Sequence, residues 1–363
     1  MSFNTLHGGD LDAAERALGV SRDEIIDFSA NINPLGVSET VKRRIAESAA
    51  CVSAYPDKGY LNLRKAIGEY TGAEPDNILV GNGSTELIGL IIKAIAPKTA
   101  LIERPCYSEY ERELSLNGGS CRYLSLREDR DFLPNTDEII SVLKGVDMLI
   151  LCNPNNPSDS VMKREETEKV VKACQRLGVF VMIDETYAEF CEDLEGITSI
   201  PLAEKYDNLA VIRGTSKFFA CPGLRLGYGV ISNNTLKEKI NNMRDLWSVG
   251  SLSAKAGEVM FSDKAYIDCT KKLVSGERKR LKAELETIKE LKTYNLNSNL
   301  VLCRILKEGV EADDIFNYLL KYNIIIRSCA GIKGLGEGYF RFCIMNPEQN
   351  DLLLKGIKEY FNI

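Results

Sequence analysis

The chain has 363 residues, of which 44% are hydrophobic and 27% are charged, and its formal net charge is −6. This length fits one large and one small domain built as a unit, and the composition is that of an ordinary globular protein. The acidic balance offers no basic surface to a nucleic acid, no apolar stretch is long enough to span a bilayer, and the first residues lack a signal pattern. We therefore expect a cytoplasmic protein with no nucleic-acid partner and no membrane partner.

Eleven cysteines and a single histidine, His7, limit the metal chemistry that the chain could support. No two cysteines form a Cys-x-x-Cys pair, and several stand in apolar runs, as Cys152 and Cys343 do. We expect reduced, buried thiols rather than disulfides or metal ligands. A zinc site or a catalytic triad that uses several histidines is hard to build with one, so we predict no bound metal.

Short apolar runs alternate with longer amphipathic stretches through the first two thirds of the chain. Residues 85–95 and 164–177 have helical spacing. Strand–helix alternation predicts a mostly parallel sheet covered by helices, which is the α/β class. The strand candidates are residues 78–80, 100–103, 147–152, 179–184, 209–213 and 226–231.

The pattern changes in the last third of the chain. A long, charged helical region runs from about residue 237 to about residue 292, and a helix is predicted at 313–321. Separated strands surround that helix, which indicates a smaller α+β domain. These strands are residues 300–305, 324–326 and 339–344.

The change of pattern also predicts how the chain divides. We expect a large domain over residues 36–255. The small domain would combine residues 256–363 with residues 1–35, which fold back on it. No internal repeat, low-complexity tract or Pro/Gly-rich linker separates the two.

A glycine-rich turn directly follows the first strand candidate and opens a helix. Residues 81–86 read Gly-Asn-Gly-Ser-Thr-Glu. Glycine permits close backbone approach, and the free N–H groups at a helix start bind phosphate, with the Ser84 and Thr85 hydroxyls as further donors. The same residues also suit a plain strand–helix turn with a serine cap, so the segment alone does not fix a phosphate site.

Two polar segments come directly after buried strand candidates, where α/β proteins bind their ligands. Residues 153–157 read Asn-Pro-Asn-Asn-Pro, and residues 184–187 read Asp-Glu-Thr-Tyr. Asn156 and Tyr187 could donate to a ring oxygen of an aromatic cofactor. Asp184 could keep a pyridine nitrogen protonated, which lets the ring accept electrons. Taken alone, the first segment is also an ordinary turn and the second a solvated helix start.

The fourth segment places a lysine and an arginine in an apolar, glycine-rich frame after a strand. Thr215 and Ser216 precede Lys217, and Arg225 follows it by eight residues. A lysine amine near a cation and an apolar wall is more readily neutral, which suits Schiff-base formation. The planar guanidinium of Arg225 suits a phosphate. A surface lysine and arginine are the alternative, although surface residues rarely sit in such a frame.

Taken in order, the four segments resemble the class I/II aminotransferase superfamily, the fold type I pyridoxal-phosphate (PLP) enzymes. The resemblance rests on Gly-x-Gly-Ser, Asn-Asn-Pro, Asp-Glu-x-Tyr and Ser-Lys followed by Gly-Leu-Arg-x-Gly, and it covers essentially the whole chain. It implies PLP as cofactor, a large domain with a mostly parallel seven-stranded sheet, and a smaller α+β domain. Lys217 would form the Schiff base and act with Asp184 and Tyr187 in catalysis. The cofactor-binding residues it implies are Gly83, Ser84, Thr85, Tyr107, Asn156, Asp184, Tyr187, Thr215, Ser216, Lys217 and Arg225.

Two tyrosines have particular places in this resemblance. Tyr107 stands where the family has the aromatic residue that stacks on the cofactor ring. Tyr60 resembles the tyrosine that reaches across a dimer to the neighbour's cofactor phosphate, which implies a homodimer with shared active sites. One departure is Gly214, where relatives often carry a serine, and it bears on Thr215 and Ser216 as phosphate ligands.

Two N-terminal segments bear on the reaction. Residues 6–10 contain His7 and Gly8, and residues 27–36 contain Ser-Ala-Asn-Ile-Asn-Pro-Leu-Gly, with Asn31 in the middle. On the residues alone, they are a flexible start and a turn-rich entry to the small domain. Both resemble the threonine-phosphate decarboxylase branch of the superfamily, whereas histidinol-phosphate aminotransferases generally share only Asn-Pro-Leu-Gly. By this resemblance, His7 and the Gly8 amide bind the substrate phosphate, with Asn31 close to it.

Two late arginines stand in or beside apolar strands. Arg327 ends the run 324–326, and Arg341 lies inside 339–344. Such an arginine is costly to bury unless it pairs with an anion, which is either an internal Asp or Glu or a ligand. By resemblance, Arg341 binds the substrate carboxylate, Arg327 helps to hold its phosphate, and Asn156 also contacts the substrate.

The resemblance predicts PLP-dependent decarboxylation of L-threonine O-phosphate to (R)-1-amino-2-propanol O-phosphate, in cobalamin biosynthesis. This small phosphorylated amino acid would be held with its Cα–carboxylate bond perpendicular to the ring, and Lys217 would supply the proton at Cα. The alternatives are an aminotransferase acting on histidinol phosphate, and L-serine O-phosphate as substrate, which is one methyl smaller. We do not expect a PLP-binding transcription regulator, because no segment for a DNA-binding domain precedes the main domain.

Overall fold

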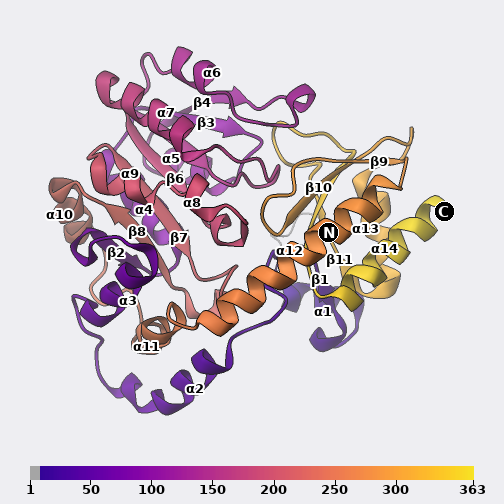
Figure 1. The fold of residues 1–363 in the computed structure, drawn as a ribbon, viewed down its shortest axis with the longest axis horizontal. Coiled ribbons are helices and arrows are strands. Elements are labelled where there is room, and N and C mark those ends of the chain that lie inside the picture. Colours follow the sequence, from indigo (N-terminus) through magenta and orange to yellow (C-terminus); the bar gives the residue numbers. More distant parts are fainter. Residues whose placement is uncertain (1–8) are drawn as a thin grey trace.

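The computed structural model describes residues 9–363, and its elements gather into two parts (Figure 1). The larger part is built on a seven-stranded sheet with the order β2-β8-β7-β6-β5-β3-β4. Every neighbouring pair is parallel except those of β8, which is antiparallel to β2 and to β7. The predicted α/β class with a mostly parallel sheet is therefore confirmed. The strands are β2 (Ile78–Gly81), β3 (Thr99–Arg104), β4 (Ser120–Ser125), β5 (Met148–Cys152), β6 (Phe180–Asp184), β7 (Leu209–Gly214) and β8 (Gly227–Ile231).

Both faces of this sheet are covered by helices. In β5, Leu149 and Leu151 pack into one apolar core, and Met148 and Ile150 pack into the other. A strand buried on both faces has no polar side to alternate with, which is why the inner strands read as continuous apolar runs. The Ile150 face is covered by α4 (Ser84–Ile95), α5 (Glu109–Leu116) and α10 (Asn234–Met243). The Leu149 face is covered by α3 (Leu61–Thr71), α6 (Thr136–Ser141), α7 (Arg164–Leu177), α9 (Ile200–Lys205) and α11 (Ser251–Met260), and α2 (Glu39–Glu47) packs on α11.

The smaller part holds a four-stranded antiparallel sheet with the order β12-β13-β10-β9. Its strands are β9 (Leu291–Thr293), β10 (Leu300–Ile305), β12 (Arg327–Ser328) and β13 (Tyr339–Cys343). The helices of this part are α1 (Leu11–Leu18), α13 (Ala312–Leu319) and α14 (Pro347–Phe361). β1 (Ile26–Asp27) pairs in parallel with β11 (Ile324–Ile325), so the start of the described chain lies against its C-terminal third. The division at residues 36 and 255 remains a prediction.

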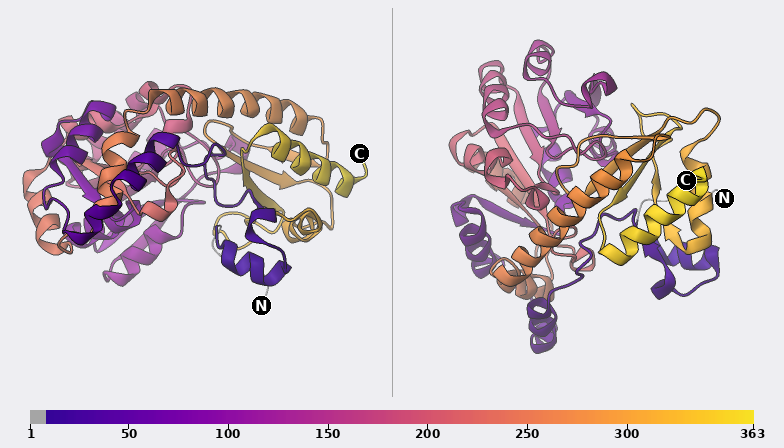
Figure 2. Two further views of the ribbon diagram at one scale, coloured as in Figure 1. Left: turned by 90° about the horizontal axis from the view of Figure 1, so that it is seen from below. Right: turned by 45° about the vertical axis from the view of Figure 1, so that its right-hand side comes forward.

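Three helices occupy the region that the sequence presents as one charged helical stretch. α10 and α11 are separated by residues 244–250, where Trp247 has a left-handed φ of 57°. α12 (Lys264–Glu286) then runs from the larger part along the smaller one, as Figure 2 shows. One further short helix, α8 (Leu194–Ile197), lies between β6 and β7 in the chain. Among residues 9–363, none of the helices combines the length and the apolar character needed to cross a bilayer.

Candidate active site

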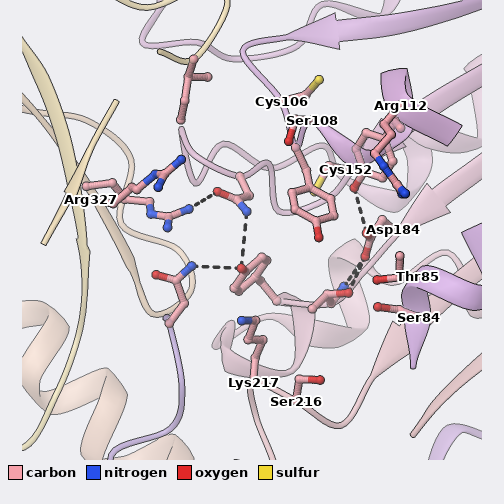
Figure 3. Close-up of a pocket in the computed structure, with 18 of the residues that line it drawn as sticks. Ser84, Thr85, Cys106, Ser108, Arg112, Cys152, Asp184, Ser216, Lys217 and Arg327 are labelled. Atoms are coloured by element: carbon pink, nitrogen blue, oxygen red, sulfur yellow. Dashed lines mark hydrogen bonds between the residues drawn. The ribbon is translucent and has the colours of Figure 1, made fainter. Parts of the chain in front are cut away.

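A cavity of about 740 Å³ lies where the carboxyl ends of the parallel strands face the smaller sheet. Figure 3 shows Ser84, Thr85 and Asp184 on one side of it and Arg327 on the other, with Lys217 between them. The two sides come from different parts of the fold, because β12 carries Arg327 and β6 carries Asp184. The cavity therefore joins the two parts. The predicted residues that line it are Asn31, Ser84, Thr85, Tyr107, Asn156, Asp184, Tyr187, Ser216, Lys217, Arg225, Arg327 and Arg341.

The Lys217 amine projects into this cavity from the loop after β7. Its Nζ donates a hydrogen bond of 2.7 Å to the Ala30 carbonyl oxygen. Removal from bulk water lowers the pKa of Lys217 to about 8, and the positive charges of Arg341 and Arg225 act in the same direction. An amine with this pKa is neutral, and so nucleophilic toward a carbonyl carbon, far more often than an ordinary lysine.

Asp184 ends β6 with a carboxylate whose two oxygens both accept hydrogen bonds. Oδ1 accepts from the backbone N–H of Thr186 at 2.9 Å and from its hydroxyl at 2.5 Å, and Oδ2 accepts from the Tyr110 hydroxyl at 2.8 Å. Burial raises the pKa of Asp184, while these three donors act to lower it. They fix the plane of the carboxylate beside the cavity, where it can accept from a cationic N–H group. Neither Tyr110 nor Thr186 was predicted to belong to the site.

The Tyr187 hydroxyl is the meeting point of two carboxamides. It accepts from Asn31 Nδ2 at 3.1 Å and from Asn156 Nδ2 at 3.4 Å. Because both bonds use its lone pairs, the hydroxyl proton stays available for donation to a third atom. Burial raises the pKa of Tyr187, so the hydroxyl keeps that proton at neutral pH. Asn156 is itself oriented by Arg341, whose Nη1 donates to Asn156 Oδ1.

The start of α4 forms an anion cradle with Arg225. Gly83 has a φ of 83°, and a Cβ there would lie 2.4 Å from Arg225 Nη2. A Cβ on Gly227 would lie 2.5 Å from the backbone nitrogen of Ser84. Only glycine fits at both positions, so the guanidinium can approach the free N–H groups and hydroxyls of Ser84 and Thr85. This combination of a helix start and an arginine suits a phosphate.

Arg327 and Arg341 stand directly opposite each other in the β12–β13 pair. Arg341 is only 7% exposed; its Nη2 donates to the Ser29 carbonyl oxygen at 3.0 Å. Within residues 9–363 its buried Nε has no hydrogen-bond partner, and the bonds of its two Nη groups go to Asn156 and Ser29 rather than to a carboxylate. Burial and the neighbouring charge of Arg341 both lower the pKa of Arg327. Two like charges placed opposite each other repel, so the pair favours an anion bound between or beside them.

Three of the predicted cofactor-binding residues do not line the cavity: Gly83, which adjoins Arg225 in the cradle, Thr215 and Tyr60. Thr215 is fully buried, and its hydroxyl donates to the Leu226 carbonyl oxygen at 3.0 Å. Tyr60 is 4% exposed, and its hydroxyl donates to the Val249 carbonyl oxygen at 3.0 Å and accepts from the Val249 N–H at 3.1 Å. The backbone of a neighbouring segment satisfies each hydroxyl, which a motif does not reveal.

The remaining residues that the sequence analysis singled out have different outcomes. His7 and Gly8 lie outside the described residues. Gly214 is close to the cradle, since a Cβ there would lie 3.3 Å from Ser84 Oγ. Cys106 and Cys152 line the cavity as free thiols, and burial keeps both pKa values above the ordinary range. Within residues 9–363, no group of three or more His, Cys, Asp or Glu side chains is arranged to hold a metal ion.

The fold and this site define a fold type I PLP enzyme, and the chain belongs to the aminotransferase class I and II family, which it matches over residues 23–357. Members of that family bind pyridoxal 5′-phosphate. Threonine-phosphate decarboxylase of Salmonella typhimurium is 36% identical over 357 residues, covering 98% of this chain and 96% of that protein. A Caldanaerobacter subterraneus protein provisionally given the same name is 38% identical over 329 residues, covering 91% and 88%. The crystal structure of histidinol-phosphate aminotransferase from Clostridium acetobutylicum superposes with a TM-score of 0.87 at 32% identity, covering 92% of this chain and 98% of that one.

Proposed function

We propose that this enzyme uses PLP to decarboxylate L-threonine O-phosphate, giving carbon dioxide and (R)-1-amino-2-propanol O-phosphate for cobalamin biosynthesis. The observation that carries the proposal is the arginine pair, Arg327 and Arg341, opposed across β12 and β13 beside Lys217. This substrate brings two anionic groups, a carboxylate and a phosphate, in one small molecule. The two relatives named for this activity support it, because they are 36% and 38% identical along most of the chain.

The groups around the cavity fit the cofactor. When bound, PLP supplies a protonated pyridine ring that accepts the electron pair of a broken bond. Asp184 would accept from the pyridinium N–H, Tyr187 and Asn156 would donate to the ring oxygen, and Tyr107 would pack against the ring. Lys217 would attach to the aldehyde carbon. The cradle for the cofactor phosphate would consist of Gly83, Ser84, Thr85, Ser216 and Arg225.

The smaller part of the fold would hold the substrate. Arg341 would bind the carboxylate, using the buried Nε that has no partner among residues 9–363. Arg327 would bind the phosphate together with Asn31, His7 and Gly8. Anchoring both ends fixes the rotation of the molecule, so that the Cα–carboxylate bond can stand perpendicular to the ring. The substrate amine would displace Lys217 from the aldehyde carbon, and once the Cα–carboxylate bond had released carbon dioxide, the freed Lys217 amine would supply one proton to Cα.

Histidinol-phosphate aminotransferase is the second candidate, favoured by the 32% identity and TM-score of 0.87 to an enzyme of that name. The two reactions break different bonds, since an aminotransferase removes the Cα proton and needs a 2-oxo acid acceptor. Incubating the PLP-loaded enzyme with L-threonine O-phosphate and no oxo acid, while measuring carbon dioxide, separates them. Parallel turnover of L-serine O-phosphate measures how far the pocket selects the extra methyl, which is worth about 1–3 kcal/mol.

We also propose a homodimer, because an exposed apolar patch lies on the larger part. It is centred on Tyr55, which is 78% exposed and stacks on Trp247 with ring centroids 4.3 Å apart. Val52, Leu61 and Leu246 are 67%, 56% and 59% exposed in neighbouring segments. Exposed apolar groups of this size suit a second copy of the chain. Since the Tyr60 hydroxyl is satisfied internally, Tyr55 is the tyrosine of this segment that is free to contact a neighbour.

A further inference from the structure

The segment between β1 and α2 passes beside the cavity with four consecutive carbonyl groups, each held by a different donor. Cys343 N–H donates to the Phe28 carbonyl at 2.9 Å, and Arg341 Nη2 donates to the Ser29 carbonyl at 3.0 Å. Lys217 Nζ donates to the Ala30 carbonyl at 2.7 Å, and Asn299 Nδ2 donates to the Asn31 carbonyl at 3.1 Å. The position of this segment therefore depends on groups far away in the sequence.

Two of these four donors, Lys217 Nζ and Arg341 Nη2, would also take part in the proposed reaction. Attachment of Lys217 Nζ to an aldehyde removes its free ammonium hydrogens, and binding of a carboxylate draws on the guanidinium of Arg341. The carbonyls of Ser29 and Ala30 then lose donors during turnover, although a buried carbonyl without a partner is unfavourable. The other two donors, the Cys343 N–H and Asn299 Nδ2, take no part in the reaction, so they can hold the segment in place throughout. One of them, the Cys343 N–H, is fixed in the backbone of β13.

The conformation of Asn31 depends most on how firmly this segment is held. Its φ of 59° lies in the left-handed region, which a residue other than glycine keeps only where its surroundings hold it. From that conformation its Nδ2 reaches the Tyr187 hydroxyl at 3.1 Å. A change in the backbone at residue 31 would swing this carboxamide away from Tyr187 and from the cavity.

Asn299 is well placed to prevent that change. It is fully buried at the start of the β10 segment, and its own carbonyl accepts from the Ile344 N–H at 2.9 Å. The preceding Ser298 donates its backbone N–H and its hydroxyl to Asp159, at 2.8 and 2.5 Å, which ties the loop to the larger part. Asn299 is not among the described residues that line the cavity, and the site residue that its side chain bonds is Asn31.

We propose that Asn299 is a positioning residue, which holds Asn31 in its left-handed conformation and thereby keeps the Asn31 carboxamide on the Tyr187 hydroxyl while Lys217 and Arg341 are engaged. The proposal rests on the proposed PLP site, because Tyr187 would donate to the cofactor's ring oxygen there. A hydroxyl that accepts from Asn31 donates more strongly in turn, since hydrogen bonds in a chain polarise one another. Without the bond from Asn31, the Tyr187 hydroxyl would donate more weakly, and the ring oxygen would be easier to protonate.

The test uses Asn299→Ala and the nearly isosteric Asn299→Asp, with Asn297→Ala as the matched control. Asn297 lies in the same loop, and its side chain bonds the Asp159 carbonyl, at 2.8 Å, rather than Asn31. The first readout is the pH midpoint of the visible absorbance of bound PLP. We expect it to rise by about 0.5 unit, roughly a threefold change in the protonation equilibrium, in both Asn299 variants and to stay unchanged in Asn297→Ala. We expect kcat/KM to fall about tenfold in the same two variants.

A double variant decides whether the effect passes through Asn31. Asn31→Gly keeps the backbone conformation accessible and removes the carboxamide, so adding Asn299→Ala to it should shift the midpoint no further. Additive shifts would overturn the proposal. So would melting temperatures that fall in the Asn299 variants while the midpoint and kcat/KM match the control, or a failure of both variants to fold. If the wild-type protein bound no PLP, the proposed function would fail before this comparison began.

Discussion

Glu103 provides a test of the interior of the larger part, through the pH dependence of stability. This β3 carboxyl is 4% exposed, and within the part of the chain that the structure describes its Oε1 has no hydrogen-bond partner. It borders a small internal cavity behind the active site, lined also by Asn153 and Ser160. Burial raises its pKa from 4.5 to about 8. The substitution that removes this titration with least change of shape is Glu103→Gln.

The sign and size of the effect follow from proton linkage. The folded protein keeps the Glu103 proton up to about pH 8, whereas the unfolded chain releases it near pH 4.5, so raising the pH favours unfolding. At about 1.36 kcal/mol per pKa unit, roughly 3.5 kcal/mol of unfolding free energy is lost between pH 5 and pH 8. Glu103→Gln has no proton to lose there. We therefore expect near-equal melting temperatures at pH 5 and a variant melting roughly 5 °C higher at pH 8.

The assay is thermal unfolding of the wild type, Glu103→Gln and a control, Glu195→Gln, across this pH range. Glu195 is an exposed residue of α8, so its replacement should leave the pH dependence of the wild type unchanged. Parallel curves for the wild type and Glu103→Gln would refute the reasoning. They would mean that Glu103 is ionised and solvated in the folded protein at neutral pH.

Three further predictions concern the site and the apolar patch. Lys217→Ala should abolish turnover while leaving the melting temperature of the apo protein near that of the wild type. In the wild type, the rate of PLP attachment, measured by absorbance, should rise with pH and level off near pH 8, because the Lys217 amine becomes neutral there. A rate that does not depend on pH would contradict the lowered pKa of Lys217. Arg341→Lys should raise KM at least tenfold, because one ammonium cannot replace the guanidinium that also orients Asn156; steady-state kinetics with unchanged KM would exclude Arg341 from carboxylate binding. Trp247→Asp should shift the protein toward a monomer in light scattering and Tyr60→Phe should not, and the reverse result would restore Tyr60 as the residue that contacts a neighbour.

Much of the larger sheet could be predicted because its inner strands are buried on both faces and therefore read as apolar runs. β4 was missed for the opposite reason: it lies at the edge of the sheet, and none of its six residues is buried. The separate helices α10 and α11 were missed because the break between them depends on local backbone conformation at residues 244–250, which carries no proline. The predicted strand 324–326 is shorter in the structure, where β11 ends at Ile325 and pairs with β1. A separate short strand, β12, begins at Arg327 and pairs with β13 in the other sheet.

In the site, the residues carried by motifs were easier to predict than those brought together by the fold. Lys217, Asp184 and Asn156 each stand in a segment with its own pattern, and the structure places them around one cavity. Tyr110, which donates to Asp184, is 74 residues away from it in the sequence, and nothing local marks the contact. Asn299 likewise meets Asn31 over 268 residues. Such partners follow from topology rather than from composition or spacing.

The most direct test of the central claim is the fate of the carboxyl carbon of L-threonine O-phosphate. With the carboxyl group isotopically labelled, PLP bound and no 2-oxo acid present, the account predicts one labelled carbon dioxide for each phosphorylated amino alcohol formed. Lys217→Ala is the matched blank. Retention of the label in the substrate, together with glutamate-dependent turnover of histidinol phosphate and no carbon dioxide, would contradict the account and assign the enzyme to the aminotransferases.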